Sequence, residues 1–219
     1  MEPSNADGAG SRATSADAVA DALQERILRA DLAPGVHLSE VDLARELGVG
    51  RHTLRAALAR LTRARLVVHY PNRGAFVATP TVAAGDDLFA YRTLLEQGGL
   101  ALALERGADL AGLRDALAVL AAMPEDEPWG NVARAHYGIH GAIVDAAGSE
   151  RLSAAYAALR TELLFFVTCI RPYYSVRGLT EDHTRLVEAI ERRDPAEASR
   201  ALAADLAGGH ASLRAASPR

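Results

Sequence analysis

Apolar residues recur at helical spacing near the start of the chain, where they predict a helix over residues 16–30. Val19, Leu23 and Ile27 repeat every four residues, which places them on one face of that helix and marks the face as buried. The tetrapeptide Leu-Ala-Pro-Gly at 32–35 ends the pattern, because proline and glycine both disfavour the continuation of a helix.

Two further helices are predicted on either side of a tight glycine turn. Ser39 followed by Asp42 resembles a capping box, so a second helix begins there and ends at Gly48. After Gly50, three leucines recur at i, i+4 and i+7 and share one face of a third helix: Leu54, Leu58 and Leu61. Two short helices joined in this way form the helix-turn-helix pattern.

The helical period stops after the third helix, and two β-prone runs follow at 66–70 and 75–78. They flank a Pro-Asn-Arg-Gly turn, which predicts a hairpin in which Gly74 has a positive φ. A hairpin in this position is the wing of a winged helix-turn-helix. We therefore expect a DNA-binding domain over residues 16–80.

From residue 84 onward only helical periods are found. The predicted helices are separated by glycine and proline and cover 84–107, 109–121, 129–147, 150–170, 180–193 and 195–214. The predicted fold class is mainly α: an N-terminal winged helix-turn-helix, and over 84–215 an all-α antiparallel helical bundle. Residues 1–15 are small and polar without any period, which predicts a disordered tail.

The amino-acid composition indicates a globular protein without a membrane span. Of the 219 residues, 49% are hydrophobic and 24% are charged, which is typical of a globular chain. No apolar run approaches the roughly 20 residues of a membrane span, and the N-terminus lacks the apolar core of a signal peptide. We expect a cytoplasmic protein without membrane contact. The single Cys169 excludes an internal disulfide and, among apolar neighbours, is expected to be a buried, inert thiol.

Positive charge is concentrated in the helix-turn-helix, although the formal net charge of the chain is −4. Seven arginines and a single acid lie between Arg45 and Arg73. On the third helix Arg51 and Arg55 point within about 40° of each other, away from the leucines. Arginine can bond O6 and N7 of guanine together, so this face is predicted to enter a major groove. The alternative is a solvated helix face. The expected DNA contacts are Arg45, Arg51, His52, Thr53, Arg55, Arg73 and Gly74.

This first domain resembles the GntR family of bacterial regulators. The matching motifs are Leu-Ala-Pro-Gly at 32–35, Leu-Ala-Arg-Glu-Leu-Gly-Val at 43–49, Arg51, Leu54-Arg55 and Asn-Arg-Gly-Ala-Phe-Val at 72–77. The resemblance implies a homodimer on palindromic operator DNA, with Arg51, Arg55 and Gly74 at contacting positions. The chain departs from the family at His52, usually Thr, at Val41, often Arg, and at Arg65, usually Gly.

A pair of histidines marks the second domain. His136 and His140 lie four residues apart, so both imidazoles project from one helix face and can share an ion. Ordinary polar residues on a helix surface have the same spacing, so the pair alone does not decide between the two. The C-terminal half also resembles the FCD subgroup of the GntR family, the FadR-like effector domain, in which one Asp and three His hold a divalent metal.

This second resemblance implies a four-residue ligand set: His136, His140, His183 and Asp205. His136 stands where the family usually has the Asp, and Asp205 stands where the family usually has the final His. The set therefore still contains three His and one Asp, with two positions exchanged. His210 competes for the last position. It lies five residues past Asp205, about 140° round the helix, and the two cannot face one ion. Zn²⁺, Ni²⁺ and Mn²⁺ all suit such a mixed nitrogen and oxygen set.

The same resemblance places Arg92, in an Arg-x-x-Leu-Glu pattern, at the pocket, where it would hold a small carboxylate effector. The alternative is a surface arginine. The sequence thus predicts a DNA-binding transcription repressor controlled by a metal-bound organic acid, and not an enzyme. Two other functions are kept: a metal sensor without an organic effector, and a metalloenzyme. The latter is disfavoured because the residues around His136 and His140 offer no catalytic base.

Overall fold

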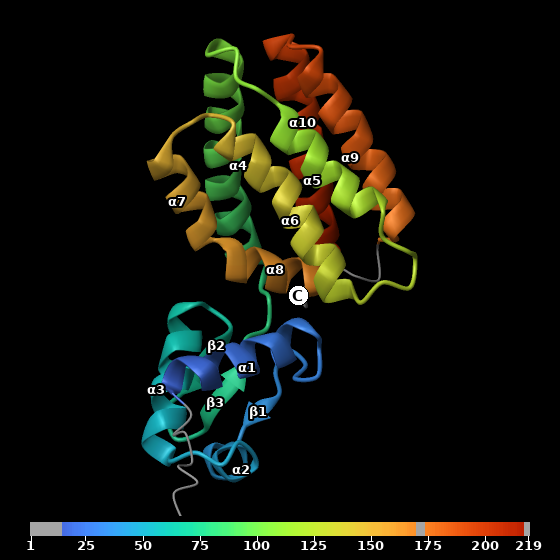
Figure 1. Cartoon of the computed structure of the whole chain (residues 1–219). Coiled ribbons are helices and arrows are strands. Elements are labelled where there is room, and N and C mark those ends of the chain that lie inside the picture. The colour runs from blue at the N-terminus through green and yellow to red at the C-terminus, as the bar shows by residue number, and fades with distance from the viewer. Residues whose placement is uncertain (1–14, 170–173, 217–219) are drawn as a thin grey trace, which may run out of the picture.

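The computed structural model describes residues 15–169 and 174–216 (Figure 1). The predicted disordered tail, apart from Ser15, lies outside the described residues. The elements in chain order are α1 (Ala16–Leu28), β1 (His37–Leu38), α2 (Glu40–Glu46), α3 (Arg51–Arg63), β2 (Val67–Tyr70), β3 (Gly74–Val77), α4 (Val82–Glu105), α5 (Ala111–Ala121), α6 (Trp129–Asp145), α7 (Glu150–Ala158), α8 (Arg160–Cys169), α9 (Val176–Glu191) and α10 (Pro195–Ala216).

The N-terminal part is a winged helix-turn-helix. The leucine face of α3 is buried against the apolar face of α1, as the periods of both helices predict. Strands β2 and β3 form the antiparallel hairpin of the wing, with Tyr70 opposite Gly74, and β1 adds a third strand beside β3. Gly74 has φ +88°, and a Cβ there would lie 3.1 Å from Nε2 of His37. The two-residue β1 is too short to give a sequence period, and it was not predicted.

The C-terminal part is a bundle of helices α4 to α10 (Figure 1). Helix α4 packs against α6 and α10, α5 packs against α6 and α9, and α10 also packs against α9. A mainly α fold with a small wing is thereby confirmed. No single helix within 15–169 and 174–216 has the length and apolar content to cross a membrane, although the bent pair α7 and α8 meets both conditions jointly.

Two predicted helices differ from those in the structure. The expected helix over 150–170 is two helices, α7 and α8, which are bent by 45° at Leu159. The bend lets α8 bury side chains in two directions. No proline or glycine in the sequence marks the position of the bend. Helix α9 begins at Val176 rather than near 180, because the Ser175 hydroxyl accepts a hydrogen bond from the Gly178 amide at 3.0 Å and caps the helix.

Helix α8 joins the two parts of the molecule. Leu164 and Phe165 belong to the core of the winged helix-turn-helix, whereas Leu163 and Phe166 belong to the core of the helical bundle. The Thr168 hydroxyl also donates a hydrogen bond to the carbonyl of Leu28 in α1, at 3.3 Å. A shift of α8 would therefore change the packing in both parts.

Candidate functional site

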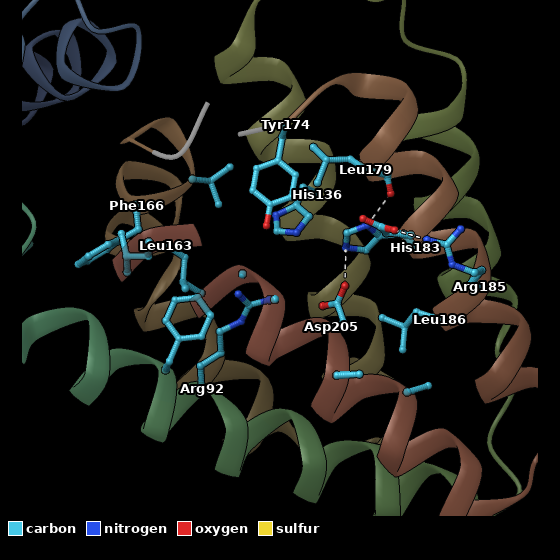
Figure 2. A pocket seen from close by; sticks show the side chains of 18 of the residues that line it. Arg92, His136, Leu163, Phe166, Tyr174, Leu179, His183, Arg185, Leu186 and Asp205 are labelled. Atoms are coloured by element: carbon cyan, nitrogen blue, oxygen red, sulfur yellow. Dashed lines mark hydrogen bonds and ion pairs between the residues drawn. The ribbon is translucent and has the colours of Figure 1, made fainter. Parts of the chain in front are cut away.

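The helical bundle encloses a cavity of about 380 Å³ between α4, α6, α8, α9 and α10 (Figure 2). Its charged and imidazole lining consists of Arg92, His136, His183 and Asp205, together with Asp182 and Arg185 on α9. Leucine, phenylalanine and other apolar residues supply most of the remaining wall. A largely apolar cavity with a few convergent polar groups is the usual form of a small-molecule site.

Three of the four predicted metal ligands form a compact cluster. His136 and His140 come from successive turns of α6, and His183 comes from α9, and each offers a ring nitrogen within 4.8 Å of the others. His140 and His183 are 0% and 2% exposed, so water does not solvate their rings. Residues 43 positions apart in the sequence thus meet in the interior.

The hydrogen bonds of two histidines determine which nitrogens are free. Nδ1 of His183 lies 2.7 Å from the carbonyl oxygen of Leu179, which can only accept, so Nδ1 carries the proton. Nδ1 of His140 lies 2.8 Å from Oε2 of Glu96 and donates to that carboxylate. When both rings are neutral, each Nε2 then carries a lone pair, and the two Nε2 atoms lie 3.2 Å apart. Two facing lone pairs repel unless a proton or a metal ion lies between them, so the neutral pair has the geometry of two metal ligands.

His136 completes this nitrogen cluster. Its Nδ1 is buried and has no hydrogen-bond partner among the described residues. Burial, followed by the repulsion that a charged His136 would meet from protonated His183 and His140 and from Arg92, holds the pKa of His136 well below its usual value. Burial also lowers the pKa of His183. Neutral imidazole is the form that binds a metal, so both rings are ready to act as ligands near neutral pH.

Asp205 on α10 lies at the edge of the cluster. Its Oδ2 is 3.5 Å from Nε2 of His140, and its Oδ1 is 3.7 Å from Nε2 of His183. His210, the competing residue, is directed elsewhere: its Nε2 lies 2.7 Å from Oδ1 of Asp86, and its ring stacks on Phe89. The structure therefore brings Asp205, and not His210, to the two buried imidazoles.

Arg92 is not a surface arginine, since only 4% of it is exposed. Its Nε donates to Oε1 of Glu96 at 2.5 Å, while the other carboxylate oxygen of Glu96 holds His140. Burial by itself would raise the pKa of Glu96, but the charge of Arg92 and the hydrogen bonds from His140 and Arg92 outweigh it and lower this pKa to about 2. Glu96 is therefore ionised and links the guanidinium to the histidine cluster.

The predicted DNA contacts lie on α2, α3 and the wing. Arg51, His52 and Arg55 are exposed on α3, and Thr53 beside them is half-buried. Arg55 is held in place by Glu40, with Nε 2.7 Å from Oε2. Arg45 on α2 forms an ion pair with Asp42. On the wing, the Arg73 guanidinium carbon lies 5.7 Å from the ring centre of Tyr70 and 5.6 Å from that of Phe76.

Comparison with known proteins assigns the chain. Residues 15–77 match the GntR family of bacterial regulatory proteins, and residues 87–208, more than half of the chain, match the FCD domain. The chain belongs to the GntR family and carries an FCD domain. Both resemblances inferred from the motifs are confirmed. This GntR-family protein is a DNA-binding transcriptional regulator of the FCD type.

Several relatives support the assignment. The protein is 29% identical over 204 residues to the transcriptional regulator LutR of Bacillus subtilis, covering 82% of this chain and 92% of LutR. It is 40% identical over 86 residues to the Nta operon transcriptional regulator of Aminobacter aminovorans, covering 38% of this chain and 41% of that regulator. It is 38% identical over 97 residues to an uncharacterised HTH-type regulator of Streptomyces ambofaciens, covering 43% of this chain and 41% of that regulator. The matches to the Aminobacter and Streptomyces regulators thus span about two fifths of those proteins.

Solved structures share the fold. A GntR transcriptional regulator of Rhodococcus sp. RHA1 superposes with a TM-score of 0.76 at 25% identity, covering 93% of this chain and 99% of that one. McbR/YncC of E. coli superposes with a TM-score of 0.68 at 22% identity, covering 90% and 96%. The latter shows the likeness of the fold alone.

The roles of two residues were not predicted from the sequence. Glu96 ends the Arg-x-x-Leu-Glu pattern, and its spacing of four from Arg92 was the available signal for their ion pair. Arg60 is one of the seven clustered arginines, yet it bonds Asp17 and Asp21 on α1 at 3.1 and 2.6 Å and so helps to hold the domain together.

Proposed function

We propose that the regulator is a repressor whose operator binding is controlled by an organic acid bound at a divalent metal in the helical bundle. The observation that carries this proposal is the pair of buried Nε2 atoms of His140 and His183, which lie 3.2 Å apart beside the Asp205 carboxylate. His136 and Asp205 would complete the ligand set. Zn²⁺, Ni²⁺ and Mn²⁺ all suit three imidazoles and one carboxylate.

Four protein ligands leave one or two coordination positions for an acid, and a metal in such a site supplies a Lewis-acidic partner for its carboxylate. Arg92 supports the same ligand class. Its Nε is bonded to Glu96, and its guanidinium lines the cavity in which the histidines lie (Figure 2). Planar guanidinium nitrogens bind carboxylates through paired hydrogen bonds.

The route from effector to DNA runs through α8. Leu163, Phe166 and Val167 line the cavity, while Phe165 and Thr168 of the same helix contact the winged helix-turn-helix. A second link is the hydrogen bond of Trp129, a further cavity residue, whose Nε1 donates to the Val167 carbonyl at 3.0 Å. An acid that moves this wall would change how α1 is held, and with it the placement of α3.

On the DNA, we propose a homodimer that reads a palindromic site, because one winged helix contacts too few base pairs for useful specificity. The exposed side chains of Arg51, His52 and Arg55 would enter the major groove, Arg73 and Gly74 would approach the adjacent backbone or minor groove, and Arg45 and Thr53 would flank the reading helix. A cytoplasmic location stays a prediction.

The test is metal analysis of the purified protein together with thermal unfolding. We expect about one divalent ion per chain, and a lower melting temperature after chelation, because an ion that binds only the folded state stabilises it. His183→Ala should abolish both effects, whereas His69→Ala, an exposed histidine on the wing, should leave both unchanged. Metal content that is absent from the native protein, or unchanged in His183→Ala, would contradict the proposal.

A further inference from the structure

The cavity beside the histidine cluster is built mainly for an apolar molecule. Its walls include Phe89 from α4, Phe166 and Leu163 from α8, Trp129 from α6 and Leu186 from α9. In Figure 2, Leu163 and Phe166 lie across the cavity from His183 and Asp205, and Arg92 lies below the space between them. His183 and Asp205 therefore lie on one side and hydrocarbon on the opposite side, with the Arg92 guanidinium between them, 5.4 Å from the centre of the Phe89 ring.

Helix α10 makes room for this molecule with small residues. Ala201, Ala204, Gly208 and Gly209 form its contribution to the wall together with Asp205. A Cβ added at Gly208 would meet nothing within 4 Å, and one at Gly209 would lie in ordinary contact with the Phe89 ring, at 3.5 Å. Ordinary side chains at these positions would take up part of the volume that the cavity now offers.

The cavity is too large for the smallest carboxylic acids to fill. An apolar cavity of about 150 Å³ holds benzene, so a volume of about 380 Å³ accommodates a carboxylate together with a ring or a chain of similar size. Acetate or a short hydroxy acid would satisfy the charged side and leave the phenylalanine and leucine wall in contact with water. Most of the hydrophobic contribution to binding would then be lost.

We propose that the effector is a carboxylic acid with a bulky apolar body, an aromatic ring or an alkyl chain of about six carbons, that lies between Phe166 and the small-residue wall of α10. The carboxylate faces Arg92 and the histidine cluster. This inference rests on the proposed function, because it assumes that the acid binds at this metal site.

The experiment measures the affinities of acetate, citrate, hexanoate and 3-phenylpropanoate for the metal-loaded, full-length protein by calorimetry. Each buried methylene strengthens binding about fourfold, so hexanoate should bind on the order of a hundredfold more tightly than acetate. 3-Phenylpropanoate should bind at least as well as hexanoate, and citrate should bind weakly. Arg92→Met should weaken both longer acids at least tenfold.

A matched pair of variants places the apolar body. Ala203 and Ala204 are neighbouring exposed positions of α10, but only Ala204 lines the cavity, so Ala204→Leu adds a side chain at the cavity wall and Ala203→Leu adds the same side chain outside it. The first should weaken 3-phenylpropanoate at least tenfold and the second by less than twofold. Thermal unfolding of both variants checks that the bundle remains folded.

Three outcomes would overturn the inference. Citrate or acetate binding as tightly as 3-phenylpropanoate, or equal effects of the two leucine variants, would contradict it and leave the metal-dependent acid site in place. Binding of 3-phenylpropanoate that survives both chelation and Arg92→Met would contradict the inference and the proposed function together, because the acid would then be held by hydrocarbon contact alone.

Discussion

Glu96 is the residue whose replacement tests the interior of the site most severely. Its carboxylate holds Arg92 at 2.5 Å on one side and His140 at 2.8 Å on the other, and it is 0% exposed. Glu96→Ala leaves the Arg92 cation buried without its partner. Breaking a buried ion pair from one side costs about 3–5 kcal/mol, which corresponds to a fall in melting temperature of roughly 6–20 °C for a chain of this size.

The same substitution frees the His140 ring. Without the carboxylate, Nδ1 is no longer fixed as the protonated nitrogen, and loss of such an outer partner typically weakens metal binding about 10- to 100-fold. The assays are thermal unfolding with and without metal and a competition titration against a chelating dye. Glu105→Ala, an exposed acid on the same helix, is the control and should change neither quantity.

A double variant separates charge from shape. Arg92→Met with Glu96→Leu removes both buried charges, so it should recover much of the lost stability without recovering metal affinity. Acid unfolding gives a third check. Since the folded pKa of Glu96 is about 2, below the roughly 4.3 of an unfolded glutamate, its stabilising contribution is present above pH 4.3 and declines as the pH falls towards 2. A melting temperature within 2 °C and an unchanged metal affinity in Glu96→Ala, each limit set at about the error of its assay, would refute the reasoning.

Four further predictions concern other residues. Asp205→Ala should lower metal content and melting temperature together, whereas His210→Ala, whose ring is bonded to Asp86, should keep full metal content; the reverse result would make His210 the ligand. Arg55→Ala should weaken operator binding by about 1–3 kcal/mol and relax the sequence preference, and unchanged binding in a gel-shift series would exclude a base contact. Burial, only partly offset by Arg65, raises the pKa of Glu162, so the native protein should lose stability relative to Glu162→Gln as the pH rises above 4.5, and parallel pH profiles would contradict this. Burial also raises the pKa of the Cys169 thiol to about 12, so alkylation by iodoacetamide at pH 7 should be slow in the folded protein and fast in guanidinium.

The periodic apolar positions predicted most helices, because each helix buries one continuous face. Val19, Leu23 and Ile27 on α1, and the three leucines on α3, all lie in the core as expected. The break between α7 and α8 could not be predicted in the same way. Residues 150–169 are apolar on several faces, and the bend depends on which distant surfaces those faces meet.

Site residues were predicted where a spacing or a family motif constrained them. The i, i+4 pair of His136 and His140 points to a shared ligand, and the FCD resemblance supplied the two residues from other helices. Glu96 escaped because its role depends on a contact with His140, 44 residues away. Arg60 shows the converse, since a basic residue in a DNA-binding domain can be occupied by acids of its own fold.

The most direct test of the account is a titration of operator binding with acid, at two states of the metal site. A palindromic site selected from random DNA is labelled, and fluorescence anisotropy reports binding of the metal-loaded protein, the chelated protein and Arg92→Met as 3-phenylpropanoate is added. We expect release of DNA only from the metal-loaded native protein. Release that is equal in all three samples, or absent from all three while the acid is bound at the site, would contradict this expectation.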